Sequence, residues 1–444
     1  MKPAIADLSV RARRHIACRL LPLVFFLYLL QVIDRYNVSF AALRMKSELE
    51  FSDTVYGFGV SLFNLTYLAF VIPGVILVER WSARKWISGI VVLWGLITLL
   101  TAFIQNAHQF YAVRLLLGAA ESSFFPGIIV YLTHWFTLKD RARAFSGFYA
   151  AAPFGSFIGS AVAGWLLSLH LLGLSGWRWL FIVEGIPAVA GGVVTFFYLT
   201  DQPSEAVWLP EAERSVTLSE IAADNAGKAK GGRLNFWDAC KDSRLLLLMT
   251  GYLFFLMSGI TNAFWMPTFL QRLSNLPATT VARLVMLPAF AGLVGLLVNS
   301  WRSDRSGERK WHTVVPVFGA GCCYLLIAIL PGHFALVVSL FTLYYLFYQA
   351  VYPTFWAIPS TFLSATTAAA VVGVIGSVGG LGAFLGPSIV GYLNDTTRSI
   401  HASLIFIGSS MLASSLTLSF LRTTAPVPIV SEQMKLPQTA PSEA

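Results

Sequence analysis

Long apolar stretches separated by short polar breaks run through most of this chain. Each stretch is 19 to 27 residues long, enough for a helix to cross the roughly 30 Å hydrocarbon core of a bilayer. Twelve of them predict membrane-spanning helices, at residues 19–42, 55–79, 86–104, 109–133, 142–168, 178–200, 244–270, 283–301, 312–331, 334–358, 368–393 and 401–421. The pattern therefore predicts an all-α membrane protein.

Composition and charge support this class. Of the 444 residues, 56% are apolar and only 12% are charged, too few charges to cover a water-soluble domain of this size. Outside the spans, Lys and Arg number 23 on the side of the N-terminus and 6 on the opposite side. This asymmetry places both termini in the cytoplasm and the chain in a plasma membrane, which in a bacterium is the inner membrane. The net charge of +9 reflects the same asymmetry, so no nucleic-acid partner is expected.

Two motifs occur twice at nearly the same interval. ERWSARK (79–85) returns as DRSGERK (304–310), 225 residues later, and FIGSAVAGWL (157–166) returns as FLGPSIVGYL (384–393), 227 residues later. These echoes indicate duplication of a unit with six spans. Because six is even, both units cross the membrane in the same direction, which predicts two six-helix bundles related as a parallel repeat.

The repeat sets the expected domain boundaries. They are an N-terminal cytoplasmic arm at 1–18, a first bundle at 19–200, a cytoplasmic linker at 201–243, a second bundle at 244–422 and a disordered cytoplasmic tail at 423–444. The linker is short and has no apolar core, which argues against an appended enzyme. The four cysteines show no CxxC spacing and are expected to be free thiols.

Five charged residues lie inside the predicted spans, away from the first two and the last residues of each span. Asp34 and Arg35 are neighbours in the first span, Arg114 and Glu121 share one face of the fourth, and Glu184 lies in the sixth. Each unpaired charge in hydrocarbon costs several kcal/mol. The least costly arrangement pairs each acid of the first and fourth spans with the arginine of the other span. A purely structural cluster is one interpretation of these charges.

The other interpretation is a site where an anion and a proton replace each other. Arginine stays charged at every physiological pH, whereas a carboxylate can be neutralised. A substrate carboxylate can take an arginine only when the competing acid releases it, and protonation of that acid is the natural release. Glu184 lies near the outer end of its span, and we expect a structural or packing role for it.

The chain as a whole resembles the major facilitator superfamily, and within it the anion:cation symporter family, which carries tartrate, phthalate, sugar acids and similar carboxylates. The resemblance rests on the twelve spans, the repeated loops, RLLLGAAESSFFPG (114–127), GWRWLFIVEGIPA (176–188) and SDRSGERKWH (303–312). It implies proton coupling by Asp34 and Glu121 and substrate binding by Arg35 and Arg114. It further implies a small organic anion as the substrate, no cofactor other than the coupling proton, and a monomer in the bilayer.

Further candidates for the cavity wall are aromatic or polar. A stripe on the tenth span contains Tyr345, Tyr348, Gln349, Tyr352 and Trp356. Such stripes are often packing surfaces, but phenol and amide groups in hydrocarbon need partners, which favours a wet cavity beside part of the stripe. The remaining candidates are Tyr67, which matches a tyrosine frequent in the family, Asn262, Trp265 and Ser377.

Span eleven departs from the family pattern, which often reads Ala-x-x-Asn-Ser-x-Gly-Asn. Here Gly376 and Gly380 stand at the two asparagine positions beside Ser377, and Val32 replaces a tyrosine two residues before Asp34. The amide that reads a sugar hydroxyl is therefore missing. We expect a larger, less polar wall and a bulkier or aromatic carboxylate as the substrate.

The repeated loops predict gates. An acid at the end of one helix, beside arginines and the start of another helix, can latch the two halves in the outward-open state. The expected gating residues are Glu79, Arg80, Arg84, Asp304, Arg305 and Arg309. Positive-inside topology alone explains the arginines but not the repeated acids.

The function predicted from the sequence is a proton-coupled symporter that imports an organic carboxylate by rocking two bundles around a central site. No GxxxxGK[ST] loop occurs, so ATP is not expected as the energy source. A proton-driven exporter of drugs or metabolites on the same fold is the alternative, although two arginines in the cavity disfavour cationic drugs. A membrane sensor or an intramembrane enzyme is a further alternative, but the spans show no cluster of metal ligands, and we expect no enzyme activity.

Overall fold

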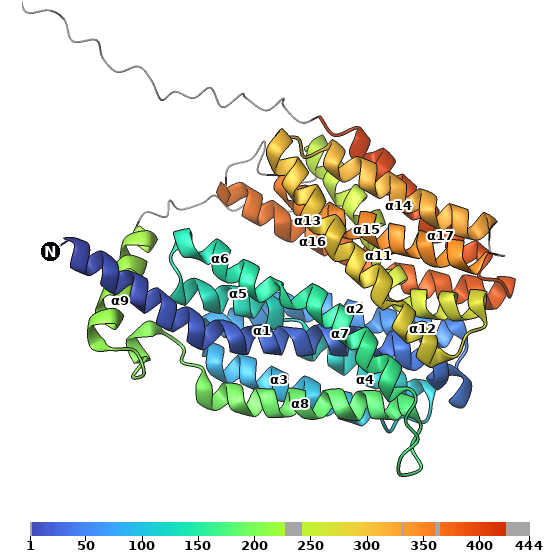
Figure 1. The fold of residues 1–444 in the computed structure, drawn as a ribbon, viewed down its shortest axis with the longest axis horizontal. Helices are drawn as coiled ribbons and strands as arrows, with labels where there is room; N and C mark the ends of the chain where they lie inside the picture. The colour runs from blue at the N-terminus through green and yellow to red at the C-terminus, as the bar shows by residue number, and fades with distance from the viewer. Residues whose placement is uncertain (1, 227–241, 331–332, 360–364, 423–444) are drawn as a thin grey trace, which may run out of the picture.

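A computed structural model describes residues 2–226, 242–330, 333–359 and 365–422. Within these ranges the regular structure is helical, apart from one isolated β-bridge between Leu171 and Leu174. The predicted tail at 423–444 and residues 227–241 of the predicted linker lie outside the described residues. The fold is therefore that of an all-α protein, as the apolar pattern predicts (Figure 1).

The helices form two bundles joined by a short connection. The first bundle contains α1 (Lys2–Glu48), α2 (Asp53–Arg80), α3 (Ala83–Thr101), α4 (Ala107–Glu121), α5 (Phe124–Trp135), α6 (Leu138–Tyr149), α7 (Ala151–Leu166) and α8 (Gly176–Tyr198). The second contains α11 (Ser243–Ser274), α12 (Ala278–Leu284), α13 (Met286–Ser306), α14 (Trp311–Ile329), α15 (Phe334–Ala357), α16 (Ala365–Thr397) and α17 (His401–Ser419). Between them lie the 3₁₀ turn η1 (Pro203–Glu205) and α9 (Glu211–Ala226).

The helices match the predicted spans closely. In the described part of the chain, 11 helical segments are long and apolar enough to cross a membrane. The remaining predicted span, 142–168, corresponds to α6 and α7, which only Ala150 separates. The fourth span is likewise broken at Ser122 and Ser123 between α4 and α5, a break that the hydropathy pattern does not reveal. The chain is thus a multi-pass integral membrane protein with twelve spans.

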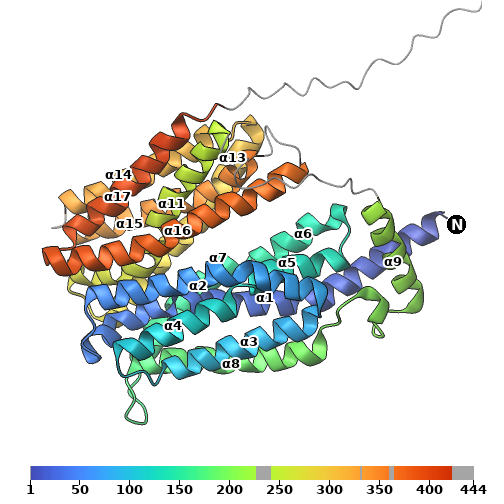
Figure 2. The ribbon, with the colours of Figure 1, turned by 180° about the vertical axis from the view of Figure 1, so that it is seen from behind.

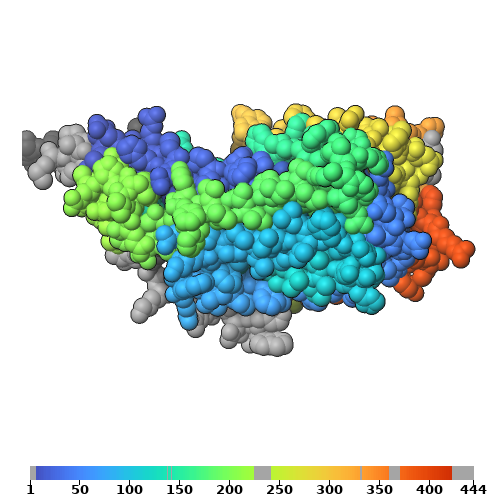
Figure 3. All heavy atoms as spheres, turned by 90° about the horizontal axis from the view of Figure 1, so that it is seen from below, coloured from blue at the N-terminus to red at the C-terminus, as the bar shows by residue number. Residues whose placement is uncertain are grey.

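Residues 2–18 of the predicted N-terminal arm are helical. They continue α1 as one helix and pack against α9, where Ser9 Oγ donates a 2.6 Å hydrogen bond to Glu220 Oε1. His15 Nδ1 lies 2.7 Å from Glu213 Oε2. The face formed by α3 and α8 continues into η1 and α9 beside the start of α1 (Figure 3). This contact between the start of α1 and α9 was not predicted, because short polar helices give no apolar signal.

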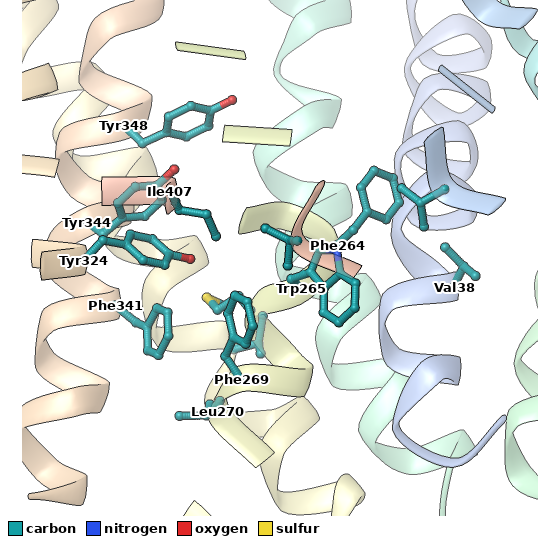
Figure 4. Packing of buried hydrophobic residues seen from close by; sticks show 14 of the residues in the cluster. Val38, Phe264, Trp265, Phe269, Leu270, Tyr324, Phe341, Tyr344, Tyr348 and Ile407 are labelled. Carbon is teal, nitrogen blue, oxygen red and sulfur yellow. The ribbon is translucent and has the colours of Figure 1, made fainter. Parts of the chain in front are cut away.

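Close helix contacts at glycines hold each bundle together. A Cβ on Gly118 of α4 would lie 2.2 Å from the backbone oxygen of Phe63, and a Cβ on Gly295 of α13 would lie 2.0 Å from that of Leu346. Helices in lipid associate through such small-residue contacts because lipid tails are as apolar as leucine. Buried aromatic side chains fill the second bundle, where Tyr324, Tyr344 and Phe341 cluster on one side and Trp265 and Phe269 on the other (Figure 4).

The two bundles are joined at one end, which we call the closed end. There Arg272 of α11 donates two 2.7 Å hydrogen bonds to the carboxylate of Asp53 on α2, and Lys46 of α1 also bonds Asp53. Asp395 of α16 accepts hydrogen bonds from the backbone N–H groups of Asp53, at 3.1 Å, and Thr54, at 2.7 Å. An acid from one bundle thus caps the first turn of a helix in the other.

The opposite end, which carries α9 and the start of α1, is called the open end. Both ribbon views show the bundles diverging toward it (Figures 1 and 2). Contacts between α2 and α16 continue from the closed end to the middle of the molecule, where Ser388 Oγ donates a 2.7 Å hydrogen bond to Ser61 Oγ. The structure is therefore a conformation closed on one side of the membrane.

Replacing Asp53 by Asn should loosen the closed end, because Lys46 and Arg272 would lose the carboxylate that joins them. We expect a cysteine introduced at Ser399, beside this cluster, to react with a maleimide about tenfold faster, corresponding to about 1.4 kcal/mol. The measurement requires a background without the native cysteines. Asp242→Asn, which removes an acid that pairs locally with Arg244, is the control. Equal labelling of Asp53→Asn and the control would show that the cluster does not hold this end shut.

Candidate functional site

Two adjoining cavities lie between the bundles. One of about 260 Å³ lies among α1, α7, α11, α13 and α15, with Tyr149 at the end of α6 and Val285 just before α13 also in its lining. The other, of about 650 Å³, lies among α1, α2, α11 and α16. Arg35, Tyr36 and Ile260 line both, so the two cavities meet at the middle of α1.

Arg35 is the charged residue that faces both cavities. Its guanidinium lies 4.5 Å from the ring centre of Tyr67, and its Nε lies 3.8 Å from Glu121 Oε2. The side chain remains 29% exposed although it lies at the middle of a span. A fixed, partly accessible positive charge beside an aromatic ring is a typical receptor for a planar carboxylate.

Glu121 lies behind Arg35 as the last residue of α4. The break at Ser122 and Ser123 follows it, and Gly74 of α2 approaches so closely that a Cβ there would lie 2.2 Å from Ser123 Cβ. Gln31 Nε2 donates a 3.2 Å hydrogen bond to the backbone oxygen of Glu121. Within the described residues the two carboxylate oxygens are buried and accept no hydrogen bond. The side chain of Glu121 therefore depends on Arg35 as its ionic partner.

Asp34 and Arg114 are buried away from the cavities. Asp34 accepts hydrogen bonds from Thr98 Oγ1 at 2.8 Å and from Asn37 Nδ2 at 2.9 Å. The Arg114 guanidinium lies 4.6 Å from the ring centre of Phe63, and the residue is 2% exposed. The predicted crossed pairing is thus present for Arg35 and Glu121, whereas no Arg114–Asp34 contact within 4.0 Å occurs in the described structure.

The aromatic stripe of α15 divides between cavity and core. Tyr345, Tyr348, Gln349 and Tyr352 line the smaller cavity, and the hydroxyl groups of Tyr348 and Tyr352 lie 2.7 Å apart. Trp356 lines neither cavity, because its ring packs 4.9 Å from that of Tyr252. The stripe rotates out of the cavity at its end, and a substrate contact by Trp356 is not supported.

Two predicted residues of α11 also lie away from the cavities. Asn262 is fully buried, and its Oδ1 accepts a hydrogen bond from the Tyr324 hydroxyl on α14. Trp265 is fully buried with its ring 5.1 Å from that of Tyr56 (Figure 4). Ile260, Ala263 and Phe264 take their places as α11 contacts at the cavities. Asn262 and Trp265 therefore do not line either cavity in this conformation.

The larger cavity has the glycine-rich wall that span eleven predicts. Tyr67, Gly376 and Ser377 line it, and Ser377 Oγ bonds back to the Gly373 oxygen at 2.9 Å. No described atom lies within 4 Å of a Cβ placed on Gly373 or Gly376. The missing side chains thus leave open space in the cavity.

Several polar residues at the site were not among the predicted ones. They are Gln31, Tyr36, Asn37, Asn64, Thr98, Ser156 and Ser160. Gln31 and Asn37 lie three residues before and after Asp34, which places them near its face of the helix. Their spacing from a charged residue was the signal available in the sequence.

The predicted gating residues lie at the open end. Asp304 and Arg309 form a 2.6 Å ion pair within their own loop. The backbone N–H of Arg84 donates a 2.7 Å hydrogen bond to Asp201 Oδ1, within the first bundle and its connection. For Glu79, Arg80 and Arg305, the described structure shows no hydrogen bond or ion pair to the other bundle. In the same part of the chain, no three His, Cys, Asp or Glu residues are grouped as for a metal ion.

Comparisons with known proteins agree with this architecture. The Major Facilitator Superfamily profile matches residues 24–387. A putative tartrate transporter from Agrobacterium vitis is 37% identical over 429 residues, covering 95% of this chain and 97% of that protein. A quinolone resistance transporter from Acinetobacter baumannii is 32% identical over 400 residues, covering 90% and 92%.

Solved structures show the same fold. A bacterial homologue of the human lysosomal transporter Spinster, solved in an inward-facing, unoccupied conformation, superposes with a TM-score of 0.72 at 16% identity. The match covers 92% of this chain and 95% of that one. Two bundles of membrane-spanning helices around a central charged cavity define a secondary transporter. This chain belongs to the Major Facilitator Superfamily.

Arg35→Lys should weaken binding of a carboxylate about tenfold or more, because lysine keeps the charge but loses the planar fork and its position over Tyr67. Arg114→Lys should affect binding less, since Arg114 does not reach the cavities. Calorimetric titration of the purified protein measures both affinities, and thermal unfolding checks that each variant is folded. An unchanged affinity in Arg35→Lys would remove this residue from the binding site.

Gly376→Asn should fold normally, because the added side chain enters open space in the larger cavity. It should also shift preference from bulky toward small hydroxylated carboxylates, since it narrows the cavity and adds an amide that can bind hydroxyl groups. Competition between carboxylates of different size measures the shift. Gly379→Asn is the contrasting variant, because its Cβ would lie 2.4 Å from Tyr252 and the protein should be destabilised. An unaltered preference in Gly376→Asn would show that substrate does not touch this wall.

Proposed function

We propose that this chain is a proton-coupled symporter that imports an organic carboxylate by alternating access of its two bundles. Arg35 binds the substrate carboxylate, while Glu121 and Asp34 take up and release the coupling proton. The cavities lie within a single chain, so a monomer suffices, and the transport cycle needs no cofactor.

The pairing of Arg35 with Glu121 is the observation that carries the proposal. Arg35 faces the cavities, whereas Glu121 is buried and its carboxylate accepts no hydrogen bond from the described residues. When a substrate carboxylate binds Arg35, Glu121 loses its ion-pair partner at a buried position. A buried carboxylate without a cation favours its neutral, protonated form. Substrate binding and proton uptake thus support each other.

This coupling of substrate binding to protonation of Glu121 also gives the direction of transport. Acid on the outside favours protonation of Glu121, which frees Arg35 for substrate before the bundles change conformation. On the inside, loss of the proton restores the Arg35–Glu121 pair and expels the substrate. A pH gradient that is acid outside therefore drives import and accumulation.

The open end is proposed to face the cytoplasm of a bacterial cell, across the inner membrane. Lys and Arg outside the spans lie mainly on the side of the N-terminus, and α1 begins at the open end (Figure 1). The repeated loops lie at this end, where Glu79, Arg80, Arg84, Asp304, Arg305 and Arg309 would latch the bundles once the open end closes. In the present conformation the Asp53 cluster holds the other side shut.

The shape of the cavities favours a carboxylate larger than a small sugar acid. The larger cavity is mainly apolar, and its polar lining residues besides Arg35 are Tyr36, Asn64, Tyr67 and Ser377. The relative named for tartrate transport supports the carboxylate class. The glycine positions of α16 favour an aromatic or otherwise bulky member of that class.

Export of a drug or metabolite is the second candidate. A relative named for quinolone resistance, 32% identical to this chain, favours it. The two functions differ in the direction of coupling, because an exporter expels substrate in exchange for protons. Parallel assays of carboxylate uptake and drug efflux in proteoliposomes of known orientation separate them.

Glu121→Gln should separate substrate exchange from proton coupling. The amide imitates the protonated acid, so Arg35 stays free for substrate, but it carries no proton. We expect carboxylate counterflow to continue within about threefold of the wild type, whereas accumulation driven by an acid outside pH should be lost. Both are measured in proteoliposomes with a panel of carboxylates.

Glu211→Gln, which changes an exposed acid of α9, is the matched control and should keep both activities. Full pH-driven accumulation by Glu121→Gln would show that the coupling proton travels elsewhere. Absence of counterflow with every carboxylate in the wild type would overturn the substrate class.

A further inference from the structure

The charges inside the spans do not balance. Away from the ends of the spans there are three acids, Asp34, Glu121 and Glu184, and two arginines, Arg35 and Arg114. All three acids are at least nine-tenths buried, with exposures of 2%, 0% and 7%. Because an uncompensated charge in such a place costs several kcal/mol, neutrality requires one proton on one of the acids.

Glu184 is the acid without a cation. It lies in the third turn of α8, and within the described residues it forms no ion pair. Its contact is with Asn37 of α1, whose Nδ2 donates a 2.8 Å hydrogen bond to Glu184 Oε2. The same Nδ2 donates a 2.9 Å hydrogen bond to Asp34 Oδ1. Asn37 thus joins the two carboxyl groups through one amide nitrogen.

The helices that pack against α8 provide no other ionisable partner. Glu184 is at the level of Leu99 and Thr98 of α3, since the neighbouring Gly185 closely approaches Leu99. The ionisable residues of α3, Arg84 and Lys85, are in its first turn, about 20 Å away along the helix. The segment of α7 contains no ionisable residue. On α1, Asp34 is the titratable group joined to Glu184, while Arg35 faces the cavities and Glu121.

Two unsatisfied atoms indicate where the proton lies. Glu184 Oε1 and Asn37 Oδ1 are both buried, and neither has a hydrogen-bond partner in the described structure. Both are acceptors when Glu184 is ionised, so they cannot bond to each other. A proton on Oε1 turns it into a donor toward the amide oxygen, while Nδ2 already donates to Oε2. Protonation of Oε1 thereby allows the cyclic pair of a carboxylic acid and a primary amide.

We propose that Glu184 is a second proton-binding site, which shares one proton with Asp34 through Asn37. In the present conformation the proton lies on Glu184 Oε1 and Asp34 is ionised. When substrate rearranges the charges around Arg35, the proton leaves Oε1 and binds a carboxylate oxygen of Asp34. Glu184 becomes ionised in that step: its O–H bond breaks, an O–H bond forms on Asp34, and the hydrogen bond from Oε1 to Asn37 Oδ1 is lost. Asn37 donates to the ionised partner in either state.

The location of the proton can be measured without transport. A buried, protonated carboxyl group gives a carbonyl band in the infrared spectrum that shifts in heavy water. We expect purified wild-type protein to show this band at neutral pH and Glu184→Gln to lose it. Thr98→Val, which removes the other hydrogen bond of Asp34, should keep the band and is the matched control. Persistence of the full band in Glu184→Gln would overturn the site.

The sharing of one proton between Glu184 and Asp34 is tested by a separate measurement, which rests on the proposed function. Addition of a carboxylate that wild-type protein transports should change the infrared band, and this change should be smaller in Glu184→Gln. In the same variant the pH dependence of carboxylate counterflow should be displaced toward lower pH. That displacement follows because the ionised neighbour of Asp34 is gone. A merely structural Glu184 would leave the pH profile unchanged, and this result would overturn the sharing.

Two further results cover the case in which Glu184→Gln fails to fold and distinguish this inference from the proposed function. If Glu184→Gln does not fold, Glu184→Asp keeps an acid on a shorter side chain and should displace the band rather than abolish it. An unmoved band in that variant would overturn the assignment. A wild-type protein that shows the band but transports no carboxylate would overturn the proposed function and leave the proton on Glu184.

Discussion

A charge in the interior of a bilayer must find its partner within the protein, and this constraint organises the centre of the molecule. Arg35 remains at the cavities because Glu121 lies behind it and Tyr67 beside it. Asp34 is held by Thr98 and Asn37 in place of the expected arginine. Neutral hydrogen-bonding side chains therefore stabilise Asp34, for which an ion pair with Arg114 was expected. The charged side chains of this site have few alternative partners. A substrate that binds one partner therefore strongly changes the stability of the charge left behind.

The same constraint connects the centre to the closed end. There Asp53 gathers Lys46 and Arg272, and Asp395 caps the first turn of α2. These contacts join the bundles by charge, and the contact of α2 with α16 extends the junction by close backbone packing. Charged groups at the membrane surface can exchange a protein partner for water. Closely packed helix backbones, in contrast, cannot separate gradually. A junction with both features favours two distinct arrangements of the bundles over a continuous range.

Much of the fold followed from the sequence because hydropathy and repetition are long-range signals. The spans, the two bundles and the five internal charges were predictable for this reason. Rotation about each helix axis was harder to predict, and it decides which side chains reach a cavity. Asn262, Trp265 and Trp356 lie on predicted helices but face the core. The break after Glu121 and the polar helix α9 have no apolar signature, so the packing around them became visible only in three dimensions.

The unbroken length of α1 has a mechanical consequence. With 47 residues it is a rod of about 70 Å, fixed near one end to α9 through Ser9 and at the other to α8, where Arg178 contacts Glu48. Asp34 and Arg35 lie on this helix between Pro22 and Glu48. A helix segment without proline keeps all its backbone hydrogen bonds and transmits rotation along its length. A twist of α1 that moves Arg35 relative to the cavities must therefore also displace Glu48 and its contact with Arg178 at the closed end.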